Sequence, residues 1–245
     1  MTVVTAHVTE HLRPILELRE ILAERWTLGI DAARARSRLA GGRVAFDPLE
    51  VLGAAGDLVV PFLRVTAAFE RCGLATSDEG VRVRRHGFHV LPLLVSWLSD
   101  EPLPVDHVRR LGRLAAGVLG NSILSRAAAE VRAGLEVEEW SRPDCPCCGG
   151  APEFVRREGH HRRLLCARCD TSWPATRGGC AGCGASTEPT IARVVASDLG
   201  YVLTICNDCG RYLKERVEGP LAHPLLERLV TTELDAAAQH RGLHL

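Results

Sequence analysis

The chain has 245 residues, with 30 basic and 30 acidic side chains and a formal net charge of zero. This length allows a substantial core in one or two domains. Balanced charge argues against a dedicated nucleic-acid binder, which usually carries a basic excess. The N-terminal ten residues lack the basic and apolar parts of a signal peptide, and no apolar run is long enough to cross a membrane. We therefore expect a soluble, cytoplasmic protein without membrane insertion.

The first part of the chain, residues 1–140, has the pattern of a helical domain with little strand signal. The expected helices cover 15–26, 31–39, 48–69, 88–98, 106–119 and 122–135. Pro14 is expected near the start of the first helix, and Pro61 divides or kinks the third. Segment 88–98 is apolar on nearly all sides, which predicts a buried central helix. A Gly-Asn pair at 120–121 predicts a break between the last two helices.

Four Cys-x-x-Cys pairs follow, and they are the most specific feature of the sequence. They are Cys145/Cys148, Cys166/Cys169, Cys180/Cys183 and Cys206/Cys209. Strand patterns predict two hairpins. One covers 153–165, between the first and second cysteine pairs, and the other covers 190–205, between the third and fourth pairs. The region therefore contains an internal repeat in which each copy is a cysteine knuckle, a hairpin and a second knuckle.

Eight thiolates at this spacing can fill two tetrahedral Cys₄ metal sites. The residue after each second cysteine is expected to need a positive φ, which glycine adopts most easily. Gly149, Gly184 and Gly210 occupy this position in three knuckles, and Asp170 occupies it in the other. A closed set of four sulfurs suits zinc or a single iron and leaves no position for substrate or activated water. We therefore expect two metal ions, no catalytic residue and a structural or electron-transfer role.

The repeat favours metal ligation over two other uses of cysteine. A thioredoxin-type redox pair usually occurs once, on a βαβ unit, and structural disulfides are not expected in a reducing compartment. Sequential pairing of the knuckles follows the repeat, but an interleaved arrangement stays open. Cys72 and Cys147 are interpreted as bystanders, because a free cysteine is often simply a buried apolar residue.

The first hairpin is expected to carry a basic tip. The residues around this tip are Arg156, Arg157, His160, His161, Arg162 and Arg163. The pattern predicts either a solvated, mildly basic turn or a contact surface for an acidic partner or RNA. Familiar phosphate-binding and hydrolase motifs are absent from the sequence.

The expected fold class is α+β. We predict a helical domain over 1–140, followed by two tandem rubredoxin-like or zinc-ribbon-like Cys₄ modules over 141–216. A C-terminal helix is expected over 224–239, within a segment 217–245 that packs back on the body.

The flanks of the knuckles resemble the formate dehydrogenase accessory protein FdhE family. The matching runs are CPCCGGAP at 145–152, RLLCARCDTSW at 163–173, CAGCG at 180–184 and CNDCGRYLK at 206–214. The resemblance implies a cytoplasmic, rubredoxin-like maturation factor that is not itself an enzyme. It implies binding to the catalytic subunit of formate dehydrogenase and help in its assembly or activation. It also implies iron as the favoured metal at the four knuckles, with zinc as the alternative.

Two other functions are kept as alternatives. Tandem zinc ribbons often bind nucleic acid, and the arginine-rich hairpin offers phosphate contacts. The zero net charge and the low aromatic content, 4% of residues, disfavour nucleic acid as the partner. A rubredoxin-like redox protein would need iron in its closed sites. A homodimer is left open.

Overall fold

The computed structural model describes residues 3–86, 90–99, 109–158, 161–175, 179–185, 190–217 and 223–245. The chain divides into two compact units. The first consists of Met1–Ala32 and Phe46–Val131, and the second of Ala33–Ala45 and Arg132–Leu245. The first is helical, whereas the second carries the strands and the cysteine pairs. The predicted α+β class, with helices first and the Cys₄ modules and helix after them, is confirmed. The domain boundaries read from the sequence stay a prediction.

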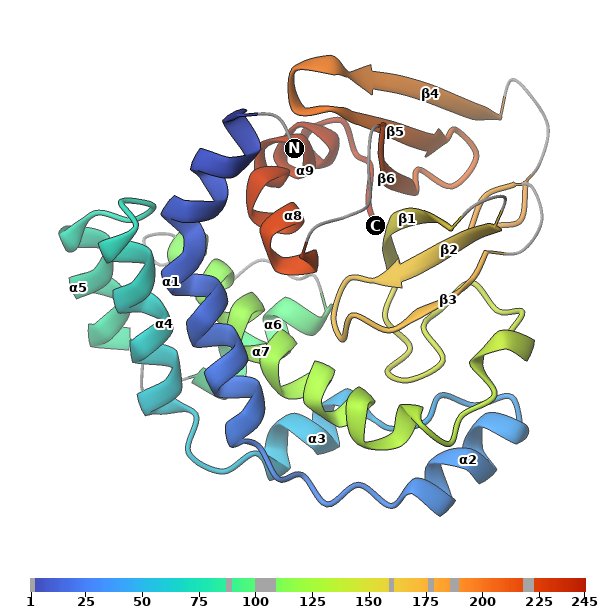
Figure 1. The fold of residues 1–245 in the computed structure, drawn as a ribbon, viewed down its shortest axis with the longest axis horizontal. Helices are drawn as coiled ribbons and strands as arrows, with labels where there is room; N and C mark the ends of the chain where they lie inside the picture. Colours follow the sequence, from blue (N-terminus) through green and yellow to red (C-terminus); the bar gives the residue numbers. More distant parts are fainter. Residues whose placement is uncertain are drawn as a thin grey trace. The chain divides into compact units, whose positions relative to one another are not determined.

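The first unit is built from amphipathic and apolar helices around a core of buried side chains (Figure 1). The helices are α1 Val3–Arg25, α3 Pro48–Ala54, α4 Val59–Arg71, α5 Ser77–His86, α6 Val90–Ser99 and α7 Arg109–Arg132. Asp47 caps α3, because its side chain accepts a hydrogen bond from the backbone N–H of Leu49 at 2.8 Å. Pro61 lies in the first turn of α4, so segment 48–69 forms two helices and not one kinked helix.

The first helix begins earlier than predicted. Pro14 lies inside α1, where it removes one helical hydrogen bond, and not near its start. Leu12 and Ile15, on either side of it, are buried. Tertiary burial of these apolar side chains therefore outweighs the local cost of the proline.

The break predicted at 120–121 is wrong, because α7 is continuous through both residues. The ring of Trp97 lies so close to Gly120 that a Cβ atom there would collide with it. The Asn121 side chain accepts a hydrogen bond from Nε of Arg19 at 3.0 Å. The Gly-Asn pair thus serves packing and polar contact within the helical unit and does not end a helix.

The predicted burial of the apolar helix is only partly right. In α6 the side chains of Leu94 and Leu98 are buried, but Leu91 and Val95 are exposed. None of the described helices is by itself long and apolar enough to cross a membrane. Among the described helices, only α3 and α4 taken together have the length and composition of a membrane span, and they bend by 99° at their junction.

The second unit contains a six-stranded sheet with the order β3-β2-β1-β6-β5-β4 (Figure 1). Its strands are β1 Pro152–Glu158, β2 His161–Cys166, β3 Ser172–Pro174, β4 Ile191–Ala196, β5 Tyr201–Cys206 and β6 Tyr212–Arg216. The two predicted hairpins are present as β1–β2 and β4–β5. The tip of the first hairpin, 159–160, lies outside the described residues. Strands β3 and β6 follow the second and fourth knuckles and were not predicted.

Parallel pairing of β1 with β6 joins the two modules into one mixed sheet. In this pairing Phe154 lies beside Lys214, and Val155 lies beside Glu215. The repeat predicted two hairpin modules, but their strands form one sheet. One sheet therefore carries both pairs of knuckles.

Two short helices, α8 Pro224–Val230 and α9 Thr232–His240, replace the single C-terminal helix that was predicted. They lie beside the sheet (Figure 1). Leu234 of α9 packs against the buried cluster formed by Phe154, Leu165 and Tyr201. The second unit also contains α2 Ala32–Ala40 and the short 3-10 helices Val137–Glu139 and Ser197–Leu199.

The one lysine of the chain lies between the sheet and these helices. Nζ of Lys214 is fully buried and contacts carboxylate oxygens of Glu153 at 2.8 Å and Asp235 at 2.7 Å. It also lies over the ring of Phe154, 4.6 Å from the centroid. These contacts connect β1, β6 and α9 through one buried cation.

Candidate metal centre

The eight predicted ligand sulfurs lie in two groups of four. One tetrad contains Cys145, Cys148, Cys166 and Cys169, and the other contains Cys180, Cys183, Cys206 and Cys209. Within each tetrad all four Sγ atoms lie within 4.8 Å of one another. The four closest contacts between knuckles, two in each tetrad, are 3.5 to 3.6 Å. Four sulfurs at 2.3 Å from a central zinc would be about 3.8 Å apart, so each tetrad fits one tetrahedral ion.

The tetrads answer the pairing question that the sequence left open. The first two knuckles meet each other, and so do the last two, so the arrangement is sequential. In each module the hairpin brings the second knuckle back beside the first. Two Cys₄ groups in this arrangement can hold two metal ions.

The backbone of each knuckle adopts the predicted turn. The residues after the second cysteines have positive φ: 71° at Gly149, 57° at Asp170, 78° at Gly184 and 72° at Gly210. Backbone N–H groups in these turns point at sulfur, as in the 3.3 Å contact from Arg168 to Sγ of Cys166. Gly182 makes the equivalent contact to Sγ of Cys180 at 3.2 Å. Such donors stabilise thiolate charge.

The first tetrad is enclosed, since all four of its cysteines are buried. Although burial opposes it, hydrogen bonds from Cys145, Cys148 and Cys169 hold the pKa of Cys166 well below its usual range. Arg228 of α8 donates to the carbonyl oxygen of Cys166 at 2.8 Å. Sequence reasoning missed Arg228, because it lies well beyond the last knuckle and no local motif marks it.

The second tetrad is more open. Cys206 is buried, Cys180 and Cys209 are half-buried, and Cys183 is exposed. Although burial opposes it, backbone N–H groups of Cys209 and Asp208 lower the pKa of Cys206 to about 7. The two tetrads therefore share one ligand set but differ in their access to solvent.

Comparison with known proteins agrees with this arrangement. No family model matches the chain. A protein named FdhE homolog from Aquifex aeolicus is 34% identical over 118 residues, which are 44% of this chain and 41% of that protein. An FdhE homolog from Haemophilus ducreyi is 27% identical over 125 residues, 48% of this chain and 41% of the relative. The chain thus spans about two fifths of the length of the curated relatives it matches.

The crystal structure of the FdhE protein from Pseudomonas aeruginosa has a similar fold. It superposes with a TM-score of 0.68 over 95% of this chain and 84% of that one, at 21% identity. The chain is similar in sequence to FdhE homologs over part of its length and shares the fold of an FdhE protein. The predicted resemblance to FdhE is therefore confirmed, and the fold extends over nearly the whole chain.

The two remaining cysteines of the chain belong to neither tetrad. Cys147 is buried within the first knuckle, and Cys72 is buried in the helical unit. Burial raises the pKa of the Cys72 thiol, which keeps it protonated. Their interpretation as bystanders stays a prediction.

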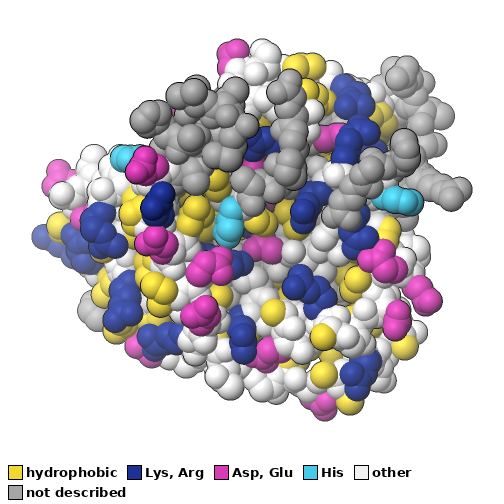
Figure 2. Space-filling view, in the orientation of Figure 1, with side chains coloured by type: hydrophobic (Ala, Val, Ile, Leu, Met, Phe, Trp, Pro, Cys, Tyr) yellow, Lys and Arg dark blue, Asp and Glu magenta, His cyan; other side chains and the backbone are white. Residues whose placement is uncertain are grey.

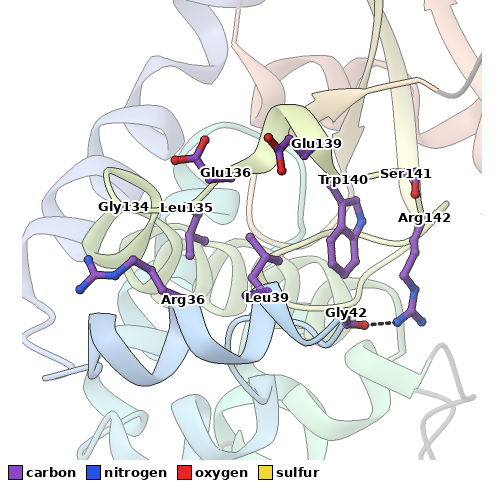
Figure 3. A pocket seen from close by; sticks show the side chains of 11 residues that line it. Arg36, Leu39, Gly42, Gly134, Leu135, Glu136, Glu139, Trp140, Ser141 and Arg142 are labelled. Carbon is purple, nitrogen blue, oxygen red and sulfur yellow. Dashed lines mark hydrogen bonds between the residues drawn. The ribbon is translucent and has the colours of Figure 1, made fainter.

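A surface cavity of about 480 Å³ in the second unit is lined by residues from 36–42 and from 134–142 (Figure 3). Leu39, Leu135 and Trp140 form an apolar part of its lining, with charged side chains around them. Nε1 of Trp140 donates to the carbonyl oxygen of Asp144 at 2.7 Å, so its indole braces the entry to the knuckle. None of the predicted ligands lines this cavity.

The face drawn in Figure 2 carries basic and acidic side chains interspersed among the described residues. No broad area of one sign is visible on it. Nucleic-acid binders usually present such an area to the phosphate backbone. The described residues of this face therefore show no phosphate-binding footprint.

Proposed function

We propose that this protein is a metal-binding maturation factor for formate dehydrogenase. It binds the catalytic subunit and assists its assembly or activation, and it acts in the cytoplasm. The observation that carries the proposal is the pair of sequential Cys₄ tetrads in a chain similar to FdhE homologs.

The eight tetrad cysteines are proposed as the ligands of two metal ions. The family resemblance favours iron, and zinc is the alternative. A bound ion would hold two knuckles together and, if it is iron, would also permit one-electron transfer. The four sulfurs of each tetrad leave no coordination position for a substrate, which supports a role other than catalysis.

Residues outside the tetrads stabilise the two metal centres and hold them in place. Backbone N–H groups of the knuckles and the guanidinium of Arg228 stabilise the negative charge of a Cys₄ centre. The shared sheet, with α8 and α9 beside it, keeps the two centres on one rigid support. Such a support suits a protein whose function is to bind another protein.

The test is an affinity capture of the tagged full chain from its native host, followed by metal analysis of the same sample. We expect the catalytic subunit of formate dehydrogenase among the captured proteins and two metal ions per chain. The double variant Cys166→Ser with Cys206→Ser disrupts both tetrads. If this variant no longer captures the catalytic subunit, capture depends on the metal centres. Full formate dehydrogenase activity in a deletion strain under all growth conditions would overturn the proposal.

A further inference from the structure

The strand β4 forms an edge of the sheet, and no described strand covers its outer side. It pairs with β5 over its whole length, from Ile191 beside Cys206 to Ala196 beside Tyr201. Val194 is 43% exposed and Val195 is 65% exposed. Natural sheets usually protect such edges with prolines, several charges, a bulge or a covering segment. β4 contains only one charged residue, Arg193, and its pairing with β5 is regular.

Three arginines surround one buried carboxylate on β6, which is two strands from β4 in the sheet. Glu215 of β6 pairs with Arg157 of β1, with Arg162 of β2 at 3.6 Å and with Arg193 of β4 at 4.0 Å. The side chain of Glu215 is 6% exposed, whereas those of the arginines are 56%, 37% and 57% exposed. The described side chains of this cluster thus carry two positive charges in excess.

Burial of Glu215 does not account for all three arginines. One guanidinium suffices to neutralise one carboxylate, and Arg157 also makes a hydrogen bond to it. Arg162 and Arg193 lie beyond hydrogen-bond distance from Glu215. Nε of Arg162 is buried without a hydrogen-bond partner among the described residues. Of these two arginines, only Arg193 lies on the edge strand, and its largely exposed guanidinium can donate N–H groups to a carboxylate ligand.

The registers place these features on one face of the sheet. Val195 lies beside Val202, and Val202 lies beside Glu215, so all three share a face. Arg193 is two residues from Val195 and projects to the same side. A strand added outside β4 would meet a positive charge at one position and an exposed valine two residues further on.

We propose that the edge strand β4, which carries Arg193, binds an extended acidic segment of a partner protein by strand addition. The backbone of the segment pairs with β4, an acidic side chain faces Arg193, and an aliphatic side chain two residues away covers Val195. A second copy of the chain is disfavoured, because it would bring like charges together. The proposal holds for any partner of this chemistry and does not depend on formate dehydrogenase.

The experiment titrates the metal-loaded full chain against a labelled ten-residue peptide that repeats Glu-Thr-Val-Thr, with fluorescence anisotropy as the readout. This repeat places glutamate and valine two residues apart on the same face of the strand. We expect saturable binding in the micromolar range. The same peptide with N-methyl groups at alternate positions cannot pair with a strand edge, and we expect its affinity to fall at least tenfold. A peptide with lysine in place of glutamate and a single-stranded RNA of similar length are expected not to bind.

Variants assign the binding to the edge. Arg193→Glu reverses the facing charge, and about a tenfold or greater loss of peptide affinity is expected. Arg82→Glu, at an exposed position of α5, makes the same charge change elsewhere and is expected to leave the affinity unchanged. Arg193→Gln is the milder replacement if the glutamate variant loses metal or helical circular dichroism.

Several outcomes would overturn the proposal. They are equal affinity for the N-methylated peptide, equal effects of the Arg193 and Arg82 variants, or RNA binding tighter than the peptide. A concentration-dependent dimer that Arg193→Glu abolishes, without peptide binding, would assign the edge to a second copy instead. No formate dehydrogenase is present in these titrations, so their failure leaves the capture experiment unaffected.

Discussion

Arg228 donates a hydrogen bond from Nη2 to the carbonyl oxygen of Cys166 at 2.8 Å, which ties α8 to the first tetrad. Its Nη1 lies 2.8 Å from Oδ1 of Asp170, and its Nε donates to Oε2 of Glu153 at 2.7 Å. Although burial opposes it, the charges of Asp170 and Glu153 raise the pKa of Arg228 above its usual range, so the guanidinium stays charged. One side chain thus connects the second knuckle, β1 and α8.

Replacing Arg228 by methionine should weaken the first tetrad. The change leaves Glu153 and Asp170 without their shared cation in a buried place, which typically costs about 3 kcal/mol or more. We expect a lower free energy of unfolding in urea and faster loss of one of the two metal ions to a chelator. Arg241→Met, at an exposed position after α9, is the matched control and should change neither quantity. Equal metal retention in both variants would show that the guanidinium does not support the tetrad.

The two tetrads should release their metal at different rates. The first is fully buried and the second includes the exposed Cys183, so a chelator needs less local opening to reach the second. We expect two kinetic phases of metal release whose rates differ by about tenfold or more. The measurement is the absorbance of the chelator–metal complex over time.

Three serine variants assign these phases. Cys183→Ser should remove the fast phase, and Cys148→Ser should remove the slow one. Cys147→Ser changes a buried thiol outside both tetrads and should keep two metal ions per chain. A single phase in the unmodified protein, or loss of one metal ion in the Cys147 variant, would contradict the assignment.

Lys214→Met should give a pH-dependent loss of stability. Burial raises the pKa of Asp235, and the charge of Lys214 opposes that rise. An acid whose pKa is higher in the folded state loses stability as pH rises from its unfolded value, near 4, through its folded value. Without Lys214 the folded pKa rises further, so this loss extends to higher pH.

We therefore expect the destabilisation by Lys214→Met to be small near pH 5 and to reach about 3 kcal/mol near pH 8, in urea unfolding of the metal-loaded chain. Adding Asp235→Asn removes one of the two carboxylates that contact Nζ and should restore part of the stability at pH 8. A loss that is independent of pH would mean that packing, and not charge, determines the effect.

Gly120→Ala should destabilise the helical unit. A methyl group at this position would collide with the ring of Trp97, and such overpacking costs about 1–3 kcal/mol. Gly117→Ala lies one turn earlier in α7, and its Cβ would be 3.4 Å from Nε1 of Trp97, an ordinary contact. We expect Gly117→Ala to be neutral or to raise the melting temperature slightly, because alanine favours the helix. Equal melting temperatures for the two variants would contradict the predicted close packing of Trp97.

Local chemistry made much of the metal region predictable. A Cys-x-x-Cys turn closes within a few residues, and the positive φ after its second cysteine follows from the turn itself, so 149, 170, 184 and 210 were identified correctly. The hairpins β1–β2 and β4–β5 followed from alternating β-branched and apolar residues. Predictions failed where packing outweighs local preference, as at Pro14 inside α1 and Gly120 inside α7.

The sequence by itself determined which eight thiols were the ligand candidates, the order of helices, knuckles and hairpins, and the resemblance to the FdhE family, because these depend on residue type and short spacing. Only the tertiary structure decided that the knuckles meet sequentially, that β1 and β6 join the modules in one sheet, and that Arg228 reaches Cys166. These contacts join residues that are distant in the chain, and their formation depends on packing that no local pattern encodes.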